Sequence, residues 1–397
     1  MSINKTAGSG HAGLALFALS MGGFAIGTTE FGTMGLVPYF ADGLHIGIVK
    51  AGQVISAYAL GVVVGAPILA VAAARLPRRI VLIGLMLFFA LGNLLSACAP
   101  NFGWMMAFRF IAGLPHGAYF GVAALVAAEL VPPGKKTQAI ASVLFGLTVA
   151  TIFGVPLANG LGQVLNWRWA FVLVALLAAA TAGLVWALVP HKAGDRSRNP
   201  LAELDALKSK HVWLTLGIGA IGFGGMFAVY TYLDSTLLQV THARPFMQPV
   251  VLALFGAGMT LGNLLAARLA DKALMQTIAG VLVWSALAMA LYPFMTGHVW
   301  SMALAAFLIG NGGGLGSPLQ ARLMDVAGRA QTLAAALNHS AMNIANALGP
   351  VLAGVAISAG WGLPSTGWVG AALALGGLAL WAAAVLAGRN GRGLAEA

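Results

Sequence analysis

Long apolar runs separated by short polar segments make up almost the whole chain. A helix that crosses the hydrocarbon core of a membrane needs about 20 predominantly apolar residues. Runs of about this length or longer lie at 13–40, 49–73, 80–98, 103–128, 137–163, 168–189, 211–238, 246–270, 274–295, 298–320, 329–358 and 364–387. Several exceed the minimum, so we expect tilted helices or turns that extend outside the membrane. The pattern predicts an all-α polytopic membrane protein with twelve transmembrane helices.

The composition excludes the other broad classes of protein. Of the 397 residues, 60% are hydrophobic and 8% are charged, whereas soluble domains average about 25% charged residues. So few charges cannot cover a water-soluble surface, and the composition does not fit a disordered chain, a disulfide scaffold or a coiled coil. The single cysteine, Cys98, cannot form a disulfide within the chain.

Lys and Arg are distributed unevenly between alternate polar segments. If the N-terminus is cytoplasmic, 17 of them lie in cytoplasmic segments and 3 on the other side. Cytoplasmic loops carry an excess of basic residues, so we expect a bacterial inner (plasma) membrane protein with both termini in the cytoplasm. The first run is too long for a cleaved signal peptide and lacks a suitably placed small-residue cleavage pattern. The net charge of +11 therefore indicates cytoplasmic loops rather than a nucleic-acid-binding surface.

The longest charged stretch divides the chain into two halves of six runs each. We expect an N-terminal half at 1–190, a cytoplasmic linker at 191–210 and a C-terminal half at 211–397. Short patterns recur at an offset of 195–197 residues: Gly113 and Gly117 with Gly310 and Gly314, Thr148, Thr151 and Gly154 with Asn343, Asn346 and Gly349, and Ala74-Arg75 with Asp271-Lys272. A shared offset near half the chain length indicates an internal repeat, and two parallel six-helix repeats are typical of transporters with a site between them.

Three segments carry a resemblance to a known family: Gly27-Thr28-Thr29-Glu30-Phe31, the run from Arg109 to Gly117, and Gly154-Val155-Pro156. With these segments the chain resembles the major facilitator superfamily. More narrowly, it is similar to the twelve-span drug:proton antiporter branch and to bacterial sugar-, arabinose- and purine-efflux-like permeases. The resemblance implies two six-helix halves that rock about a central site. We expect a proton gradient as the energy source, no cofactor, and a monomer, with a dimer as the alternative.

Glu30 is the only acidic residue near the middle of an apolar run. An ionised side chain at that depth costs on the order of 3 kcal/mol, so an intramembrane carboxylate is functional by default. Burial favours the neutral, protonated form of such a group, which suits a proton carrier. The alternative is a structural hydrogen bond to another helix.

Arg109 is the only basic residue within an apolar run. Its guanidinium stays charged in proteins, so it needs a partner inside the membrane. In the antiporters that the chain resembles, the arginine of this motif is assigned to proton transfer. We therefore pair Arg109 with Glu30 as proton-coupling residues. The alternative is a packing residue that joins the first and fourth helices through backbone carbonyls.

Other polar side chains inside the runs are candidates for a substrate cavity. His116 and Tyr119 lie three residues apart and share one side of the fourth helix, and His339 and Asn343 share one face of the eleventh. The full set of candidates is Thr29, His116, Tyr119, Tyr230, Asn338, His339 and Asn343. The alternative for these residues is helix packing, interhelical hydrogen bonding or, for the tyrosines, anchoring at the membrane interface.

The polar segment after the second run contains Arg75, Arg78 and Arg79. In the family that the chain resembles, this segment carries an acid that pairs charges at a cytoplasmic gate, but Ala74 stands at its position here. The second half has Asp271 at the matching position. We predict a cytoplasmic gate formed by the three arginines and Asp271, although membrane topology alone also explains the arginines.

The sequence contains no pattern for a phosphate-binding loop, a metal-ligand cluster or a serine nucleophile. We therefore expect neither an enzyme nor a metal site. The leading hypothesis is a proton-coupled antiporter that exports a small organic molecule, such as a sugar, a nucleoside or a drug. The alternative is a proton symporter or a uniporter that takes up a small polar solute. The expected partners are this substrate, protons and membrane lipid, with no nucleic acid.

Overall fold

The computed structural model describes residues 9–46, 48–192, 200–244 and 246–393, and every regular element within these ranges is helical. The first part of the chain forms α1 (Ser9–Gly43), α2 (Ile48–Ala73), α3 (Arg78–Ala97), α4 (Phe102–Glu129), η1 (Pro133–Lys135), α5 (Lys136–Val149), η2 (Ala150–Gly154), α6 (Val155–Val164) and α7 (Trp167–Leu188). The second part forms η3 (Pro200–Lys208), α8 (Lys210–Gly217), η4 (Ile218–Gly222), α9 (Gly224–Gln239), α10 (Met247–Met295), α11 (Val299–Gly310), η5 (Asn311–Leu315), α12 (Gly316–Val326), α13 (Gln331–Ala356), η6 (Ile357–Trp361), η7 (Leu363–Ser365) and α14 (Thr366–Gly393).

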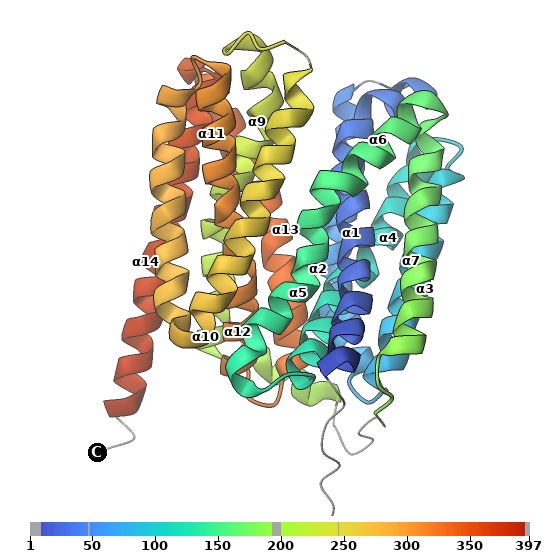
Figure 1. Cartoon of the computed structure of the whole chain (residues 1–397), viewed down its shortest axis with the longest axis vertical. Helices are drawn as coiled ribbons and strands as arrows, with labels where there is room; N and C mark the ends of the chain where they lie inside the picture. Colours follow the sequence, from blue (N-terminus) through green and yellow to red (C-terminus); the bar gives the residue numbers. More distant parts are fainter. Residues whose placement is uncertain (1–8, 47, 193–199, 245, 394–397) are drawn as a thin grey trace, which may run out of the picture.

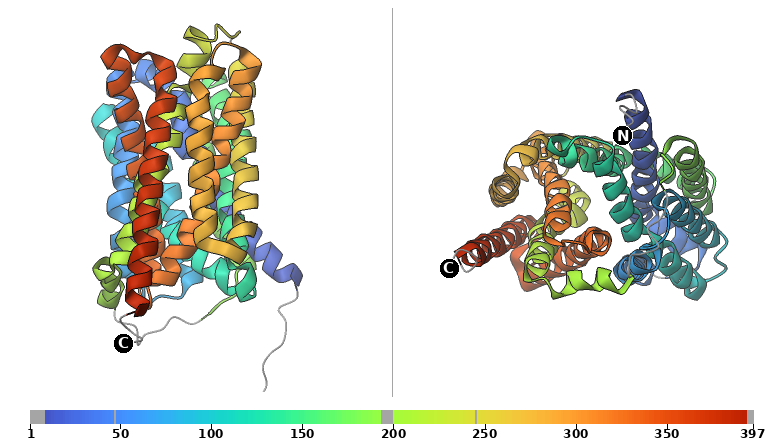
Figure 2. Two further views of the ribbon diagram at one scale, coloured as in Figure 1. Left: turned by 90° about the vertical axis from the view of Figure 1, so that its left-hand side faces the viewer. Right: turned by 90° about the horizontal axis from the view of Figure 1, so that it is seen from below.

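The helices stand side by side in two bundles (Figure 1). Helices α1–α7 form one bundle, the N-terminal half, and α8–α14 form the other, the C-terminal half. Helix α1 begins and α14 ends at the bottom of Figure 1, which we call the terminal face; the opposite end is the far face. In the view from the terminal face, η3 (light green) lies between the two bundles (Figure 2, right).

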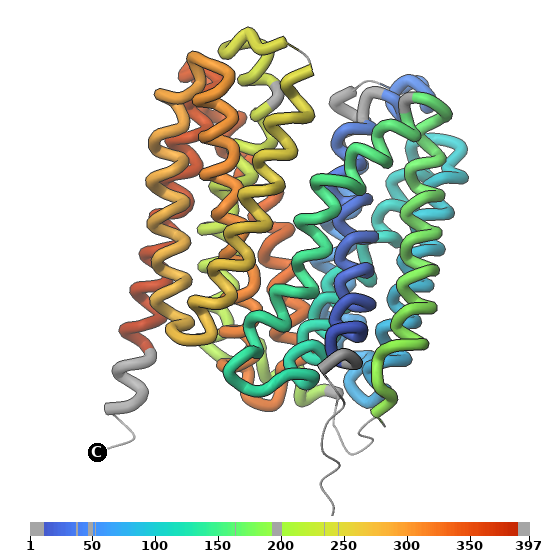
Figure 3. The backbone as a smooth tube through the Cα atoms, viewed as in Figure 1, coloured from blue at the N-terminus to red at the C-terminus, as the bar shows by residue number. Residues whose placement is uncertain are grey.

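The predicted number of transmembrane helices is confirmed, although two of them form one unbroken element. Eleven helices of the described residues are long and apolar enough to cross a membrane. One of these, α10, has 49 residues and contains a non-helical residue, Ala273, with φ −150° and ψ 72°. The backbone turns back within α10 at the terminal face (Figure 3). The two arms of α10 are therefore the eighth and ninth spans, and the total is twelve.

The internal repeat appears in the way helices cross within each half. A Cβ atom on Gly113 would collide with the backbone carbonyl of Tyr58, where α4 crosses α2. In the other half, a Cβ on Gly310 would collide with the carbonyl of Phe255, where α11 crosses α10. Both residues of the second pair lie 197 positions after their counterparts. Small residues let membrane helices approach closely, so the repeated glycines preserve one helix crossing in both halves.

Helices from opposite halves close the terminal face. Helix α5 packs against α10, and α13 packs against α2 and α4. Asn263 of α10 donates a hydrogen bond to the carbonyl of Ala141 in α5 at 3.0 Å. A Cβ on Gly121 of α4 would collide with the backbone of Ala336 in α13. The N-terminal parts of α5 and α13 are thus in direct contact with the opposite half.

Candidate functional site

A small cavity lies between the two bundles, and both halves contribute to its wall. Its volume is about 60 Å³, well below the roughly 300–1,000 Å³ of pockets that enclose drug-sized ligands. The lining consists of Glu30, Phe31, His116, Leu144, Leu147 and Thr148 from the N-terminal half and Phe223, Met226, Phe227, Met259, Asn263, Gly313, Gly316, His339, Met342 and Asn343 from the C-terminal half. The site is therefore small in this conformation and combines apolar side chains with a few polar ones.

Glu30, on α1, is the one carboxylate among the side chains that line this cavity. The two threonines before it form hydrogen bonds elsewhere. Thr28 Oγ1 donates to the carbonyl of Phe24 at 2.7 Å, which is a bond within α1. Thr29 Oγ1 donates to Asn93 Oδ1 on α3 at 2.9 Å. The Glu30 carboxylate thus faces the cavity without a bond to either neighbour, as a group that exchanges protons or binds a ligand must.

Arg109 is fully buried beside this carboxylate, on α4. Its Nη1 donates to Thr29 Oγ1 at 3.1 Å and to Asn93 Oδ1 at 3.4 Å. Its Cζ lies 4.4 Å from the centre of the Tyr58 ring, the distance of a cation–π contact. The opposite charges of Arg109 and Glu30 attract each other. The guanidinium therefore joins α1, α2, α3 and α4, and it also provides a fixed positive charge close to the only carboxylate of the cavity wall.

A chain of rings leads from Arg109 towards the C-terminal half. A hydrogen bond of 2.9 Å joins the Tyr58 hydroxyl to His116 Nδ1. The His116 ring lies 5.4 Å, between centroids, from the ring of His339 on α13. His339 in turn stacks on Phe120 of α4 at 4.3 Å. The two histidines thus meet where the halves meet, and both line the cavity.

Two polar atoms of the cavity wall on α13 have no hydrogen-bond partner among the described residues: His339 Nε2 and Asn343 Oδ1. Asn343 uses its amide nitrogen for a bond of 3.0 Å to the carbonyl of His339. A buried polar atom without a partner costs about 1–3 kcal/mol. A ligand that forms hydrogen bonds with these two atoms would recover that cost, so they are suited to substrate recognition.

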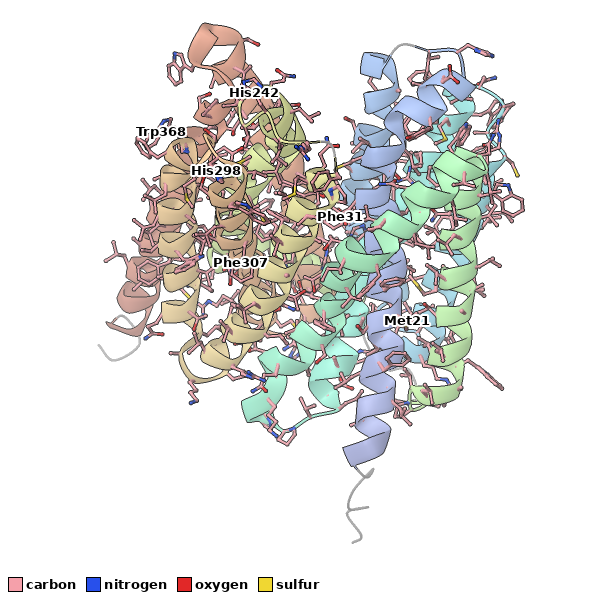
Figure 4. The ribbon with its side chains drawn as sticks, turned by 45° about the horizontal axis from the view of Figure 1, so that its top comes forward. Met21, Phe31, His242, His298, Phe307 and Trp368 are labelled. Carbon is pink, nitrogen blue, oxygen red and sulfur yellow. The ribbon has the colours of Figure 1, made fainter. Side chains whose placement is uncertain are left out.

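The other four substrate candidates lie outside the cavity lining: Thr29, Tyr119, Tyr230 and Asn338. The Tyr119 hydroxyl donates to the carbonyl of Leu19 on α1 at 2.8 Å, so this side chain joins two helices. Tyr230 meets the ring of Phe31 edge-on at 6.2 Å, across the boundary between the halves. Phe31 lies on the side of α1 that faces the C-terminal half (Figure 4).

Sequence reasoning missed four polar residues of this site: Tyr58 and Asn93, which contact the buried Arg109 network, and Thr148 and Asn263, which line the cavity. Asn93 is a buried polar residue within the third apolar run, so its polarity alone was a usable signal. Tyr58 gave no such signal, because an aromatic residue within an apolar run is typical of packing. The phenylalanines and methionines of the cavity wall could not be predicted either, because their spacing is the same whether a helix faces a cavity or another helix.

Two of the predicted gate arginines, Arg78 and Arg79, bind partners within their own half of the molecule. Arg78 pairs with Glu129 at the end of α4. Arg79 donates to the backbone carbonyl of Trp186 in α7. Arg75 is exposed in the turn after α2. The contacts of Arg78 and Arg79 therefore stabilise the N-terminal half rather than the contact between the halves.

Asp271, the fourth predicted gate residue, does connect the two halves. Its Oδ1 accepts a hydrogen bond from the backbone N–H of Thr137 at 2.8 Å, and its Oδ2 accepts one from Gln138 at 3.2 Å. Both donors lie in the first turn of α5. Lys136 of the same turn pairs with Asp325 of α12 at 2.5 Å. The start of α5 is thus held to the C-terminal half at the terminal face.

The sequence profile of the Major Facilitator Superfamily matches residues 19–327. The chain belongs to this family. The inner membrane transport protein YdhP of Escherichia coli K12 is 39% identical over 364 residues, which cover 91% of this chain and 94% of that protein. A probable sugar efflux transporter of Helicobacter pylori is 29% identical, with 94% of this chain and 96% of that protein covered.

The fold is also found among solved structures. The crystal structure of the E. coli fucose:proton symporter FucP matches with a TM-score of 0.71 at 15% sequence identity, and the match covers 94% of this chain and 98% of FucP. Family and fold together make this chain a multi-pass transporter of the bacterial inner-membrane type with a small-molecule substrate, rather than an enzyme.

Proposed function

We propose that this transporter is a proton-coupled antiporter that exports a small organic molecule by alternating access. The observation that carries the proposal is the position of Glu30, a single carboxylate in the cavity between the halves and beside the buried charge of Arg109. We assign the terminal face and both termini to the cytoplasm, because the basic loops favour that orientation. The energy source is the proton gradient, without a cofactor, and the transporter acts as a monomer.

Proton and substrate compete for Glu30 in this scheme. Protonation neutralises the carboxylate and weakens its attraction to Arg109 while the cavity is open to the outside. When the cavity opens to the cytoplasm, the positive charge of Arg109 favours loss of the proton. The ionised Glu30 is then available to the substrate. Because one site cannot hold both, the halves move outward with substrate and return with a proton.

The chemistry of the cavity wall limits the substrate. Phenylalanine and methionine side chains provide apolar contact, and the free atoms of His339 and Asn343 provide hydrogen bonds. This combination suits a molecule with both an apolar surface and several polar groups. The similarity to a probable sugar efflux transporter supports a sugar, and nucleosides and drugs of similar size combine the same kinds of surface.

Proton movement in proteoliposomes tests the proposal. A pH gradient is imposed, and sugars, nucleosides, amino acids and drugs are added in turn to wild-type protein and to Glu30→Gln. We expect one substrate class to drive proton movement in the opposite direction, and we expect Glu30→Gln to abolish it. Glu129→Gln is the matched control: the same substitution, at an exposed carboxylate paired within the N-terminal half.

The same experiment separates the proposal from its alternative. Proton movement in the same direction as the substrate would indicate a symporter, the reading that the shared fold also permits. Substrate flux without proton movement, unchanged in Glu30→Gln, would refute the role of Glu30 and leave a uniporter.

A further inference from the structure

Helix α13 begins at the terminal face without a capping side chain of its own. The first N–H groups of a helix have no partner within it and need acceptors. The residue at the N-cap of α13 is Ala330, which has no acceptor in its side chain. Glu203 Oε2, from η3, accepts the hydrogen bond of the Leu333 N–H at 3.0 Å. Leu333 is the third residue of the helix, whose N–H an N-cap side chain normally binds.

Helix α5 shows the same arrangement in the other half. Its N-cap residue, Lys135, makes no capping hydrogen bond, and Asp271 binds the N–H groups of Thr137 and Gln138 instead. Gln138 and Leu333 lie 195 positions apart, which is the offset of the internal repeat. By contrast, α4 and α7 start at the far face with their own caps, Asn101 and Asn166. The two helices that start in contact with the opposite half are capped by carboxylates from outside their own half.

The origin of the second carboxylate is unexpected. Asp271 lies in the turn within α10, and the matching position in the first half is Ala74, after α2. A symmetric molecule would use an acid at Ala74 to cap α13. Alanine cannot accept the bond, and Glu203 of the connecting segment takes that place. Glu203 is only 4% exposed, so its carboxylate is shielded from solvent and binds the start of α13 instead.

The segment that carries Glu203 also touches the N-terminal half. Ala206 of η3 is 1% exposed and belongs to one apolar cluster with Ala66 and Ala70 of α2 and with Ala330 and Leu333 of α13. Element η3 therefore packs against both α2 and α13. The terminal face cannot open unless one of these two contacts breaks.

We propose that Glu203 is a gate residue. Its carboxylate caps α13 from the neighbouring element η3, and η3 thereby holds α13 against α2 while the terminal face is closed. The carboxylate combines a charge-assisted hydrogen bond with the favourable interaction between a negative charge and a helix N-terminus. The proposal rests on the alternating-access part of the proposed function and is independent of proton coupling and of substrate identity.

Distance measurements across the terminal face test the gate. In a Cys98→Ser background, spin labels at Leu76→Cys and Arg329→Cys, both exposed sites, report the separation of the halves by double electron–electron resonance in lipid nanodiscs. No substrate or pH gradient is present, so a failure of proton coupling would leave this readout intact. We expect Glu203→Ala to raise the ratio of open to closed distances about 3- to 10-fold, in line with the loss of a helix cap. Glu203→Gln, which keeps an acceptor without charge, should give a smaller rise.

Asp205→Ala is the matched control. Asp205 lies two residues away in η3, and its exposed carboxylate pairs with Lys208 and raises the pKa of that lysine. This variant should leave the distances unchanged. Equal distances in wild type and Glu203→Ala, or an equal shift in Asp205→Ala, would overturn the proposal.

A rescue variant separates the gate from simple helix capping. Ala330→Ser in the Glu203→Ala background gives α13 a cap of its own but does not restore the hydrogen bond to η3. We expect the double variant to regain the melting temperature of the parent and still show the open distances. Recovery of the closed distances would mean that Glu203 only caps the helix and is not a gate residue.

Discussion

Arg109 in α4 and Ala306 in α11 occupy equivalent positions in the two halves, 197 residues apart. Arg109 is surrounded by Thr29, Asn93 and Tyr58, which bind its charge. Ala306 is equally buried but belongs to the apolar cluster of the C-terminal half. The two helices still cross their neighbours at the same glycines. The difference teaches that the repeat retains the helix crossings, while the buried arginine of the N-terminal half has only an alanine at the equivalent position of the other half.

The largest effect should follow from removal of the charge that distinguishes the halves. Arg109→Met removes the donor to Thr29 Oγ1, reduces the donors of Asn93 Oδ1 to the Thr29 hydroxyl, and leaves Glu30 without its neighbouring charge. We expect proton-coupled flux in proteoliposomes to fall by at least about 100-fold, since breaking a buried charged network costs about 3–5 kcal/mol. Ala306→Ser, at the equivalent position, should change flux less than about twofold, because a helical serine can bond to the carbonyl one turn before it. Equal losses in both variants would contradict the asymmetry.

The shared glycine crossings should respond alike. Gly113→Ala and Gly310→Ala each force a methyl group against a backbone carbonyl of the neighbouring helix, and overpacking of this kind costs about 1–3 kcal/mol. We expect both variants to lower the apparent melting temperature in detergent by similar amounts. Gly84→Ala is the control, because a Cβ there meets no atom within 4 Å. The two crossings would not be energetically equivalent if Gly113→Ala lowered the melting temperature while Gly310→Ala left it at the value of Gly84→Ala.

The smallest effect should follow from a substitution in the part of the cavity wall that the C-terminal half contributes. His339→Gln changes the free Nε2 of the C-terminal wall, and a single neutral hydrogen bond contributes about 1 ± 0.5 kcal/mol. We expect the KM of the exported substrate to rise about 3- to 10-fold with little change in the maximal rate. His298→Gln, at the exposed start of α11, should leave KM unchanged. A fall in maximal rate at constant KM would instead assign His339 to the conformational change.

The sequence was sufficient for the spans, the repeat and the family, because each depends on a pattern along the chain. Apolar length fixed the twelve spans, including the division of α10 near Ala273, where the polar pair Asp271-Lys272 separates two apolar runs. Glu30 and Arg109 were singled out as candidates by the same means. A charge within an apolar run is conspicuous without any knowledge of its neighbours.

The partners of these residues could not be predicted in the same way. Periodicity shows that Tyr119 and His116 share one side of α4, but it does not show that α1 covers the first and the cavity the second. Glu203 was equally hidden, since an acid in a short charged linker is usually solvated. Its role depends on the position of η3 against α13, a contact between elements more than a hundred residues apart in the chain.

The small volume of the central cavity has a consequence for electrical insulation. A space of about 60 Å³ holds roughly two water molecules at the density of the liquid. Two molecules cannot form a continuous file of water through the membrane, and phenylalanine and methionine side chains surround them. We therefore expect the transporter to leak few protons while the halves are in this arrangement.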